Sequence, residues 1–203
     1  YDLCLVPGHD QPRPAAHVIE TCGGLNRVQS IAGDQHGSGL LLVGGPSRHY
    51  RWNTEQVIDQ LSRIIRYSPL RQWTLATSRR TPAGFAENLR HRLFSPTRPV
   101  HIVPWRETSP EWLVTHYSRT DCVWVTEDSV SMLYEALTAG LPTGVLELPQ
   151  RRNGRVVRGV RQLIRQQQVI PFSAWVRGRP LQRPDRSFDE ANRCADWICT
   201  HWA

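Results

Sequence analysis

Short apolar runs alternate with stretches of helical periodicity between Leu40 and Leu148, and this alternation limits the fold more than any other feature of the chain. The runs are too short for helices and carry almost no charge, as is typical of strands that helices cover on both faces of a sheet. They are residues 40–43, 73–77, 100–103, 122–126 and 143–148. We therefore predict an α/β fold: a Rossmann-like parallel sheet of five strands with flanking helices.

Capping signals predict where the intervening helices begin. The expected caps are Asn53, Thr81 before Pro82, Ser109 before Pro110, and either Asp128 or Ser129. The first of these helices carries apolar residues at helical spacing, namely Val57, Leu61, Ile64 and Ile65. The last is expected to end at Gly140, with Pro142 behind it.

Two regions flank this core. Residues 1–30 hold two short apolar segments, at 3–6 and 17–21, which we predict to be strands of a neighbouring domain. After Pro149 we expect a basic amphipathic helix, then a loop rich in Pro and Arg. Ser187 should cap a final helix whose inward residues are Ala191, Cys194, Ala195 and Ile198. The predicted divisions are 1–30 for the end of an N-terminal Rossmann-like domain, 38–176 for the binding domain, and 177–203 for a C-terminal loop and helix.

Charge and composition narrow the ligand class. All 25 basic side chains are Arg and the net charge is +7. Guanidinium groups bind phosphate through two hydrogen bonds, so we expect a phosphate-bearing small molecule and no nucleic acid. Cysteine and histidine spacings typical of zinc sites are missing, so no metal is expected.

The expected location is the cytoplasm, because the five cysteines are odd in number and scattered, as in reduced proteins. No apolar run approaches the length of a membrane span, although the basic helix could contact anionic lipid at the inner face of a membrane. The chain opens on an apolar segment without Met, from which we expect a fragment or a processed chain.

The most informative stretch is VTEDSVSMLYEALTAGLP, residues 125–142, which runs from a strand end through a polar turn into a helix. A helix N-terminus presents free N–H groups and partial positive charge, so this turn can hold a diphosphate. The candidate binding residues here are Glu127, Asp128, Ser129, Ser131 and Met132, with Glu135 placed to accept hydrogen bonds from ribose hydroxyls. Plain helix capping is the alternative reading of the turn.

Two further strand ends add candidates. Gly44 and Gly45 allow a backbone to approach a ligand closely, and Ser47 follows them, although an ordinary turn would also use these residues. This loop is not a GxGxxG sequence, which disfavours NAD. The next loop supplies Ser78, Arg79 and Arg80, of which the arginines could neutralise a diphosphate. Trp105 could stack on a base.

Glu127 and Glu135 lie eight residues apart and resemble the E-x7-E arrangement of GT-B glycosyltransferases. Ala136, Gly140 and Pro142 match the EAxxxGxP ending of that arrangement. More narrowly, the stretch 125–142, with LLVGGPSRHYRW, VPGHD and CGGLNRV, resembles the mitochondrial-fission Elm-one family, which includes bacterial members.

The resemblance implies the C-terminal domain of a GT-B-type two-domain fold. Such a domain would bind a nucleotide sugar as substrate, without metal or other cofactor, for transfer to an unknown acceptor. A lipid-linked or glycan component of the cell envelope is the candidate acceptor. The N-terminal domain would be largely missing, so this chain alone is expected to be inactive, and no catalytic residue is assigned. The alternatives are a non-catalytic adaptor, as the family's link with mitochondrial fission suggests, and a GT-B-fold nucleotide-sugar epimerase.

Overall fold

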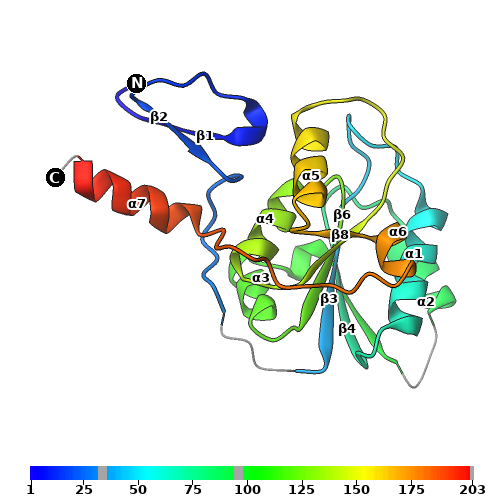
Figure 1. The fold of residues 1–203 in the computed structure, drawn as a ribbon. Coiled ribbons are helices and arrows are strands. Elements are labelled where there is room, and N and C mark those ends of the chain that lie inside the picture. Colours follow the sequence, from blue (N-terminus) through cyan, green and yellow to red (C-terminus); the bar gives the residue numbers. More distant parts are fainter. Residues whose placement is uncertain (32–35, 94–97, 202–203) are drawn as a thin grey trace.

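The computed structural model describes residues 1–31, 36–93 and 98–201. Its main body is a six-stranded parallel sheet with helices on both faces, and a separate two-stranded parallel sheet lies beside helix α7 (Figure 1). The strands are β1 (Cys4–Pro7), β2 (Val18–Thr21), β3 (Ser38–Val43), β4 (Gln72–Thr77), β5 (Val100–Val103), β6 (Cys122–Thr126), β7 (Thr143–Leu146) and β8 (Ile170–Pro171). The helices are η1 (Gly8–Asp10), α1 (Thr54–Tyr67), α2 (Phe85–Arg92), η2 (Trp105–Glu107), α3 (Pro110–Tyr117), α4 (Val130–Thr138), α5 (Arg155–Arg165), α6 (Phe172–Val176) and α7 (Glu190–His201).

The order of strands in the large sheet fixes where a ligand can bind. The order is β5-β4-β3-β6-β7-β8, so the chain moves outward from β3 to one edge, returns, and continues from β6 to the other edge. This is the doubly wound Rossmann order. Its switch point lies between β3 and β6, and loops leaving these strands at their carboxyl ends diverge there and leave a crevice.

Side chains alternate between the two faces of the sheet, as the strand geometry requires. Leu40 and Leu42 of β3 pack into the cluster that contains residues of α3, α4 and α5. Leu41 and Val43 pack into the opposite cluster, with residues of α1, α2 and α6. Helices α3 and α4 lie on the opposite side of the sheet from α1, α2 and α6 in Figure 1. The predicted α/β fold with a parallel sheet is therefore confirmed.

All five predicted strands are present, and the sheet gains a sixth, β8, that the sequence did not predict. Two of the predicted caps are confirmed, because Asn53 accepts a hydrogen bond from the Gln56 amide and Ser109 from the Trp112 amide. The basic amphipathic helix is α5. The two expected N-terminal strands pair as β1 and β2, whereas the predicted division into domains stays a prediction.

The prediction that Thr81 caps a helix is wrong. Helix α2 begins at Phe85, after Gly84 at the N-cap position. The Thr81 hydroxyl instead donates to the Gly44 carbonyl at 2.6 Å and accepts from the Ser78 amide at 2.8 Å. Thr81 therefore ties two loops together, a role that its local sequence could not reveal.

The predicted start of the last helix is also wrong. Helix α7 begins at Glu190, and the Asp189 carboxylate accepts from the Asn192 amide at 3.2 Å. Ser187 accepts from the Asp189 amide and so stabilises the turn before the helix. Of the residues expected to face inward, Cys194 is buried but Ala195 is exposed.

A side-chain amide joins helix α1 to the end of β7. Gln60, which is buried, donates through Nε2 to the Glu147 carbonyl at 2.8 Å and accepts through Oε1 from the Glu147 amide at 2.8 Å. The amide thus makes the two hydrogen bonds that a neighbouring strand would make. It ends the strand without leaving its last peptide group unpaired.

We expect Gln60→Met to lower the free energy of unfolding by about 1–3 kcal/mol, because the Glu147 amide loses its acceptor in a partly buried place. Urea denaturation measures this change. Gln162→Met, at an exposed position of α5, is the matched control and should have little effect. Equal effects of the two substitutions would contradict the role given to Gln60.

Candidate functional site

A cavity of about 1040 Å³ opens at the carboxyl ends of the central strands, beside the switch point of the sheet. Its walls come from the ends of β3 and β4, the loops that follow β4 and β5, the first turns of α3 and α4, and one residue of α5. The lining residues are Leu42, Ala76, Thr77, Ser78, Arg79, Arg80, Trp105, Thr108, Ser109, Trp112, Leu113, Asp128, Ser129, Val130, Ser131, Met132 and Val156. Seven of the twelve predicted site residues are among them, namely Ser78, Arg79, Arg80, Asp128, Ser129, Ser131 and Met132.

The N-terminus of α4 forms one wall of this cavity. The Leu133 amide donates to the Ser129 carbonyl at 3.2 Å, which is where the intrahelical hydrogen bonds begin. The amides of Val130, Ser131 and Met132 precede this bond and have no acceptor within the helix. Ser129 is the N-cap residue, as predicted, but its side chain makes no capping hydrogen bond. The cavity wall therefore includes a helix terminus that can donate to an anion.

An ion pair holds the loops of the cavity together. Arg80 Nη1 lies 2.5 Å from Asp128 Oδ2, and the Asp128 side chain has 0% of its surface exposed. Arg80 also donates to the Gly45 carbonyl at 3.2 Å and to Ser129 Oγ at 3.3 Å. The Gly45 amide in turn donates to Asp128 Oδ2 at 3.1 Å. These contacts join the loops after β3, β4 and β6 into one unit.

The two arginines of the loop after β4, Arg79 and Arg80, differ in their surroundings. Asp128 offsets most of the charge of Arg80, whose side chain is 43% exposed. Arg79 is exposed and lines the cavity, and it forms no ion pair with any residue in the part of the chain that the structure describes. Arg79 therefore supplies the uncompensated positive charge of this wall.

Gly44 and Gly45 permit a close approach between loops of the protein itself. A Cβ atom on Gly44 would lie 2.3 Å from Asp128 Oδ2, and one on Gly45 would lie 1.9 Å from the Arg80 carbonyl oxygen. Neither glycine lines the cavity. Their small size is thus required by the packing of the three loops, before any ligand is considered.

Ser47 stabilises its own loop and does not face the cavity. Its hydroxyl oxygen accepts from the amides of His49 and Tyr50, at 3.2 and 3.1 Å. The loop continues against the segment after β7, where Tyr50 pairs with Gln150 in an antiparallel bridge. Ser47 therefore shapes the backbone near the switch point from outside the cavity wall.

The two glutamates of the E-x7-E spacing are also absent from the cavity lining. Glu127 accepts from the Leu148 amide at 2.8 Å, and burial raises its pKa to about 7 in spite of this hydrogen bond. Glu135 accepts from the Tyr117 hydroxyl at 3.4 Å, and burial raises its pKa as well. Glu135 does not line the cavity, and the ribose contact predicted for it stays a prediction.

Aromatic side chains on the opposite wall complete the cavity. Trp105 is 37% exposed, its amide donates to Thr77 Oγ1 at 3.0 Å, and the Arg106 guanidinium lies 5.0 Å from the centre of its ring. Trp112 lines the cavity too and stacks on His116 at 3.6 Å between ring centres. The sequence suggested Trp105 but not Trp112. The Ser109 cap, which sets Trp112 in the first turn of α3, was the available signal.

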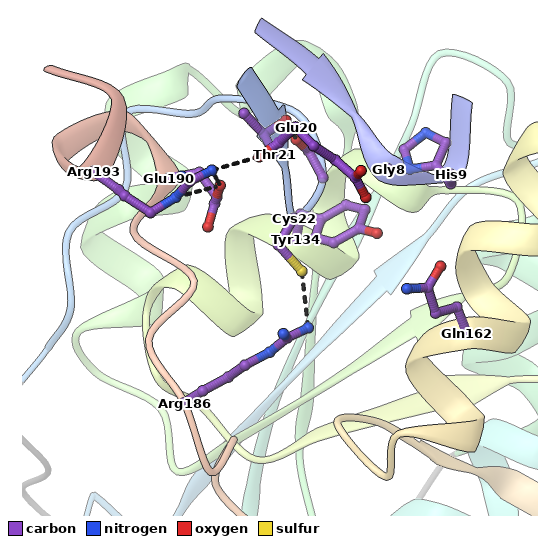
Figure 2. Close-up of a pocket in the computed structure, with 11 residues that line it drawn as sticks. Gly8, His9, Glu20, Thr21, Cys22, Tyr134, Gln162, Arg186, Glu190 and Arg193 are labelled. Atoms are coloured by element: carbon purple, nitrogen blue, oxygen red, sulfur yellow. Dashed lines mark hydrogen bonds and ion pairs between the residues drawn. The ribbon is translucent and has the colours of Figure 1, made fainter. Parts of the chain in front are cut away.

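A smaller cavity of about 240 Å³ lies between β2, η1, α4, α5 and α7 (Figure 2). Its arginines already have acceptors: Arg193 lies 2.6 Å from Glu190 Oε2 and donates to the Glu20 carbonyl at 2.6 Å. Arg186 donates to Cys22 Sγ at 2.9 Å. Because these cations already have acceptors, this cavity offers less to an anionic ligand than the larger one.

Within the described residues, no group of three or more His, Cys, Asp or Glu side chains is placed to hold a metal ion. None of the described helices is both long and apolar enough to cross a membrane.

A family model described as "Mitochondrial fission ELM1" matches residues 1–202, almost the whole chain. The chain belongs to this family. Among curated proteins no sequence matches it. Among solved structures, this ELM1-family chain is similar to Phytolacca americana UGT2 complexed with UDP-2fluoro-glucose and pterostilbene, at 16% identity and a TM-score of 0.39. The similarity covers 80% of this chain and 32% of that one, so the chain spans about a third of that protein's length.

We expect Gly45→Ala to destabilise the ligand-free protein by about 1–3 kcal/mol, because the added methyl group would overlap the Arg80 carbonyl. Thermal and urea unfolding measure the change. Gly24→Ala is the matched control, since a Cβ there would meet no atom within 4 Å. If Gly45→Ala leaves the stability unchanged, the three loops do not pack as described.

We also expect the stability difference between Glu127→Gln and the unaltered chain to depend on pH. The folded-state pKa of Glu127 lies above its ordinary value of 4.5, so the folded protein binds this proton more tightly than the unfolded chain does. Stability contributed by the protonated form is complete below pH 4.5 and is lost as the pH rises through about 7.

Glutamine keeps the acceptor for Leu148 without the charge. The variant should therefore be more stable than the unaltered chain at pH 8, by up to about 3 kcal/mol, and much less so at pH 5. Urea denaturation at both values measures the difference. An advantage of equal size at pH 5 and pH 8 would show that the buried charge is not its cause.

Proposed function

We propose that this ELM1-family chain binds a nucleotide sugar in the cavity of about 1040 Å³ at the switch point. In this proposal it is the nucleotide-binding, C-terminal domain of a GT-B-like glycosyltransferase, and the sugar passes to an acceptor that other parts of the protein help to bind. The observation that carries the proposal is the meeting of the α4 N-terminus, Arg79 and Trp105 in one cavity.

The diphosphate is assigned to the α4 wall. The amides of Val130, Ser131 and Met132 can donate to phosphate oxygens, and the helix dipole adds favourable potential. Arg79 supplies a full positive charge nearby, whereas Arg80 is held by Asp128 and mainly keeps the wall in place. This arrangement would stabilise the nucleotide as leaving group through amides and a guanidinium.

The base is assigned to the opposite wall. Trp105 offers an exposed ring at the end of β5, and Trp112 and Leu113 add apolar surface. An aromatic ring stacks on any base, so this wall supports nucleotide binding without selecting one base. The proposal assigns no contact to Glu135.

Isothermal titration of the chain with UDP, GDP, ADP and CMP sugars tests the proposal. We expect one of these classes to bind, and we expect Trp105→Ala to cost about 1–3 kcal/mol of its binding free energy through lost stacking. Arg79→Gln should weaken binding about tenfold or more, because a charge-assisted hydrogen bond is lost.

Arg90→Gln, at an exposed position of α2, is the control for the general loss of positive charge. It should leave the affinity unchanged within about twofold, as expected for a distant, screened charge. Absence of binding by every nucleotide sugar, or equal losses from Arg79→Gln and Arg90→Gln, would contradict the assignment.

A further inference from the structure

A third cavity, of about 520 Å³, lies next to the proposed nucleotide site and is strongly basic. It is formed by η1, the loop after β3 and the first turn of α5. The lining residues are His9, Asp10, Arg48, His49, Gly154, Arg155, Val156 and Arg158. Three arginines thus face a space that contains one carboxylate. We propose that this cavity is a binding site for a phosphate group.

The single carboxylate is already engaged and does not neutralise the cavity. Asp10 Oδ2 lies 3.5 Å from Arg155 Nη1, and this pair joins η1 to α5. Arg158 and Arg48 have no ion-pair partner among the residues that the structure describes. The cavity therefore keeps a net positive charge from two guanidinium groups, the groups best suited to phosphate.

Several buried nitrogens in its lining lack partners. His9 Nδ1, His49 Nδ1 and Arg158 Nε are closed off from solvent and make no hydrogen bond within the described part of the chain. They are three of the six such side-chain atoms there. An unpaired buried polar atom costs free energy, and a bound acceptor would recover it where the lining shifts to bring such an atom into contact with the ligand.

The hydrogen bonding of His49 shows that its unpartnered atom is a donor. Arg48 Nε donates to His49 Nε2 at 3.0 Å, so Nε2 accepts and the ring proton is on Nδ1. Burial, then Arg48 and Arg152, lower the pKa of His49, which keeps the ring in this neutral form near pH 7. Gly154 allows the close fit, because a Cβ there would lie 2.8 Å from Nδ1.

Both signs of charge around this cavity act on the pKa of His9. Its pKa is lowered first by burial, and Arg158 and Arg155 lower it further, against the opposing effect of Asp10. Helix α5 begins in the same cavity, with Gly154 as N-cap, no side-chain cap and no acidic residue in the first turn. Amides and guanidinium groups therefore converge on one place where the protein supplies little negative charge.

Val156 lines both this cavity and the larger one, so the two share a wall. A phosphate bound here could come from either of two molecules. It could be the distal phosphate of the nucleotide itself, reaching past Val156, or the phosphate of a second, phosphorylated substrate. The assignment of the source rests on the proposed function, whereas the phosphate site does not.

Calorimetric titration of the full chain with inorganic pyrophosphate at low ionic strength tests the site. We expect saturable binding that Arg158→Gln weakens about tenfold or more, the loss expected for one charge-assisted hydrogen bond. Arg165→Gln, at the far end of the same helix, removes the same charge outside the cavity and should change the affinity less than about twofold. Thermal unfolding checks that both variants fold.

Three results would overturn the proposal: no binding of pyrophosphate, equal losses from Arg158→Gln and Arg165→Gln, or a loss caused by Arg79→Gln alone. The last would place the anion in the larger cavity.

Nucleoside mono- and diphosphates then identify the source. If Arg158→Gln weakens binding of the nucleoside diphosphate but not of the monophosphate, the nucleotide reaches this cavity. If it weakens binding of pyrophosphate but of neither nucleotide, a second substrate supplies the phosphate. If no nucleotide binds, the proposed function is contradicted, whereas the pyrophosphate result still supports the phosphate site.

Discussion

The Arg80–Asp128 ion pair is the interaction on which the organisation of the switch point depends. Asp128 is a fully buried carboxylate, and such a charge is tolerated only with a close partner and further hydrogen bonds. Arg80 provides the partner, and the Gly45 amide provides another donor. Since the three groups come from three different loops, satisfying this one charge sets the positions of the loops that follow β3, β4 and β6. The α4 terminus, which begins one residue after the Ser129 cap, is positioned as a consequence.

Much of the fold could be predicted because its signals are local. Strands covered on both faces exclude charge, and this exclusion is visible in the sequence for β3, β4 and β6. Strand β8 has two residues, one of them Pro171, and has no such pattern. Thr81 stood before a proline as helix caps do, yet its hydroxyl serves a carbonyl 37 residues away in the chain. Contacts of that kind depend on tertiary structure and cannot be read from spacing.

For the candidate site too, local signals could be predicted from the sequence and tertiary contacts could not. The strand-end position of residues 128–132 placed them at the crevice, because parallel strands end at one edge of the sheet. The directions of Glu127 and Glu135 could not be predicted, since each is decided by a neighbour from another element, Leu148 in one case and Tyr117 in the other. The basic cavity escaped prediction for a related reason. It assembles η1, Arg48 and the start of α5 from three separate parts of the chain.

The amide of Gln60, which completes the end of β7, has a consequence for how the domain opens. The Glu147 N–H is bonded to a side chain of α1 and not to a neighbouring strand. Its exchange with deuterated solvent requires α1 to separate from the sheet, even if all strand pairs stay intact. This single amide is therefore a natural reporter for detachment of that helix, separate from the global unfolding that governs exchange at the centre of β3 and β6.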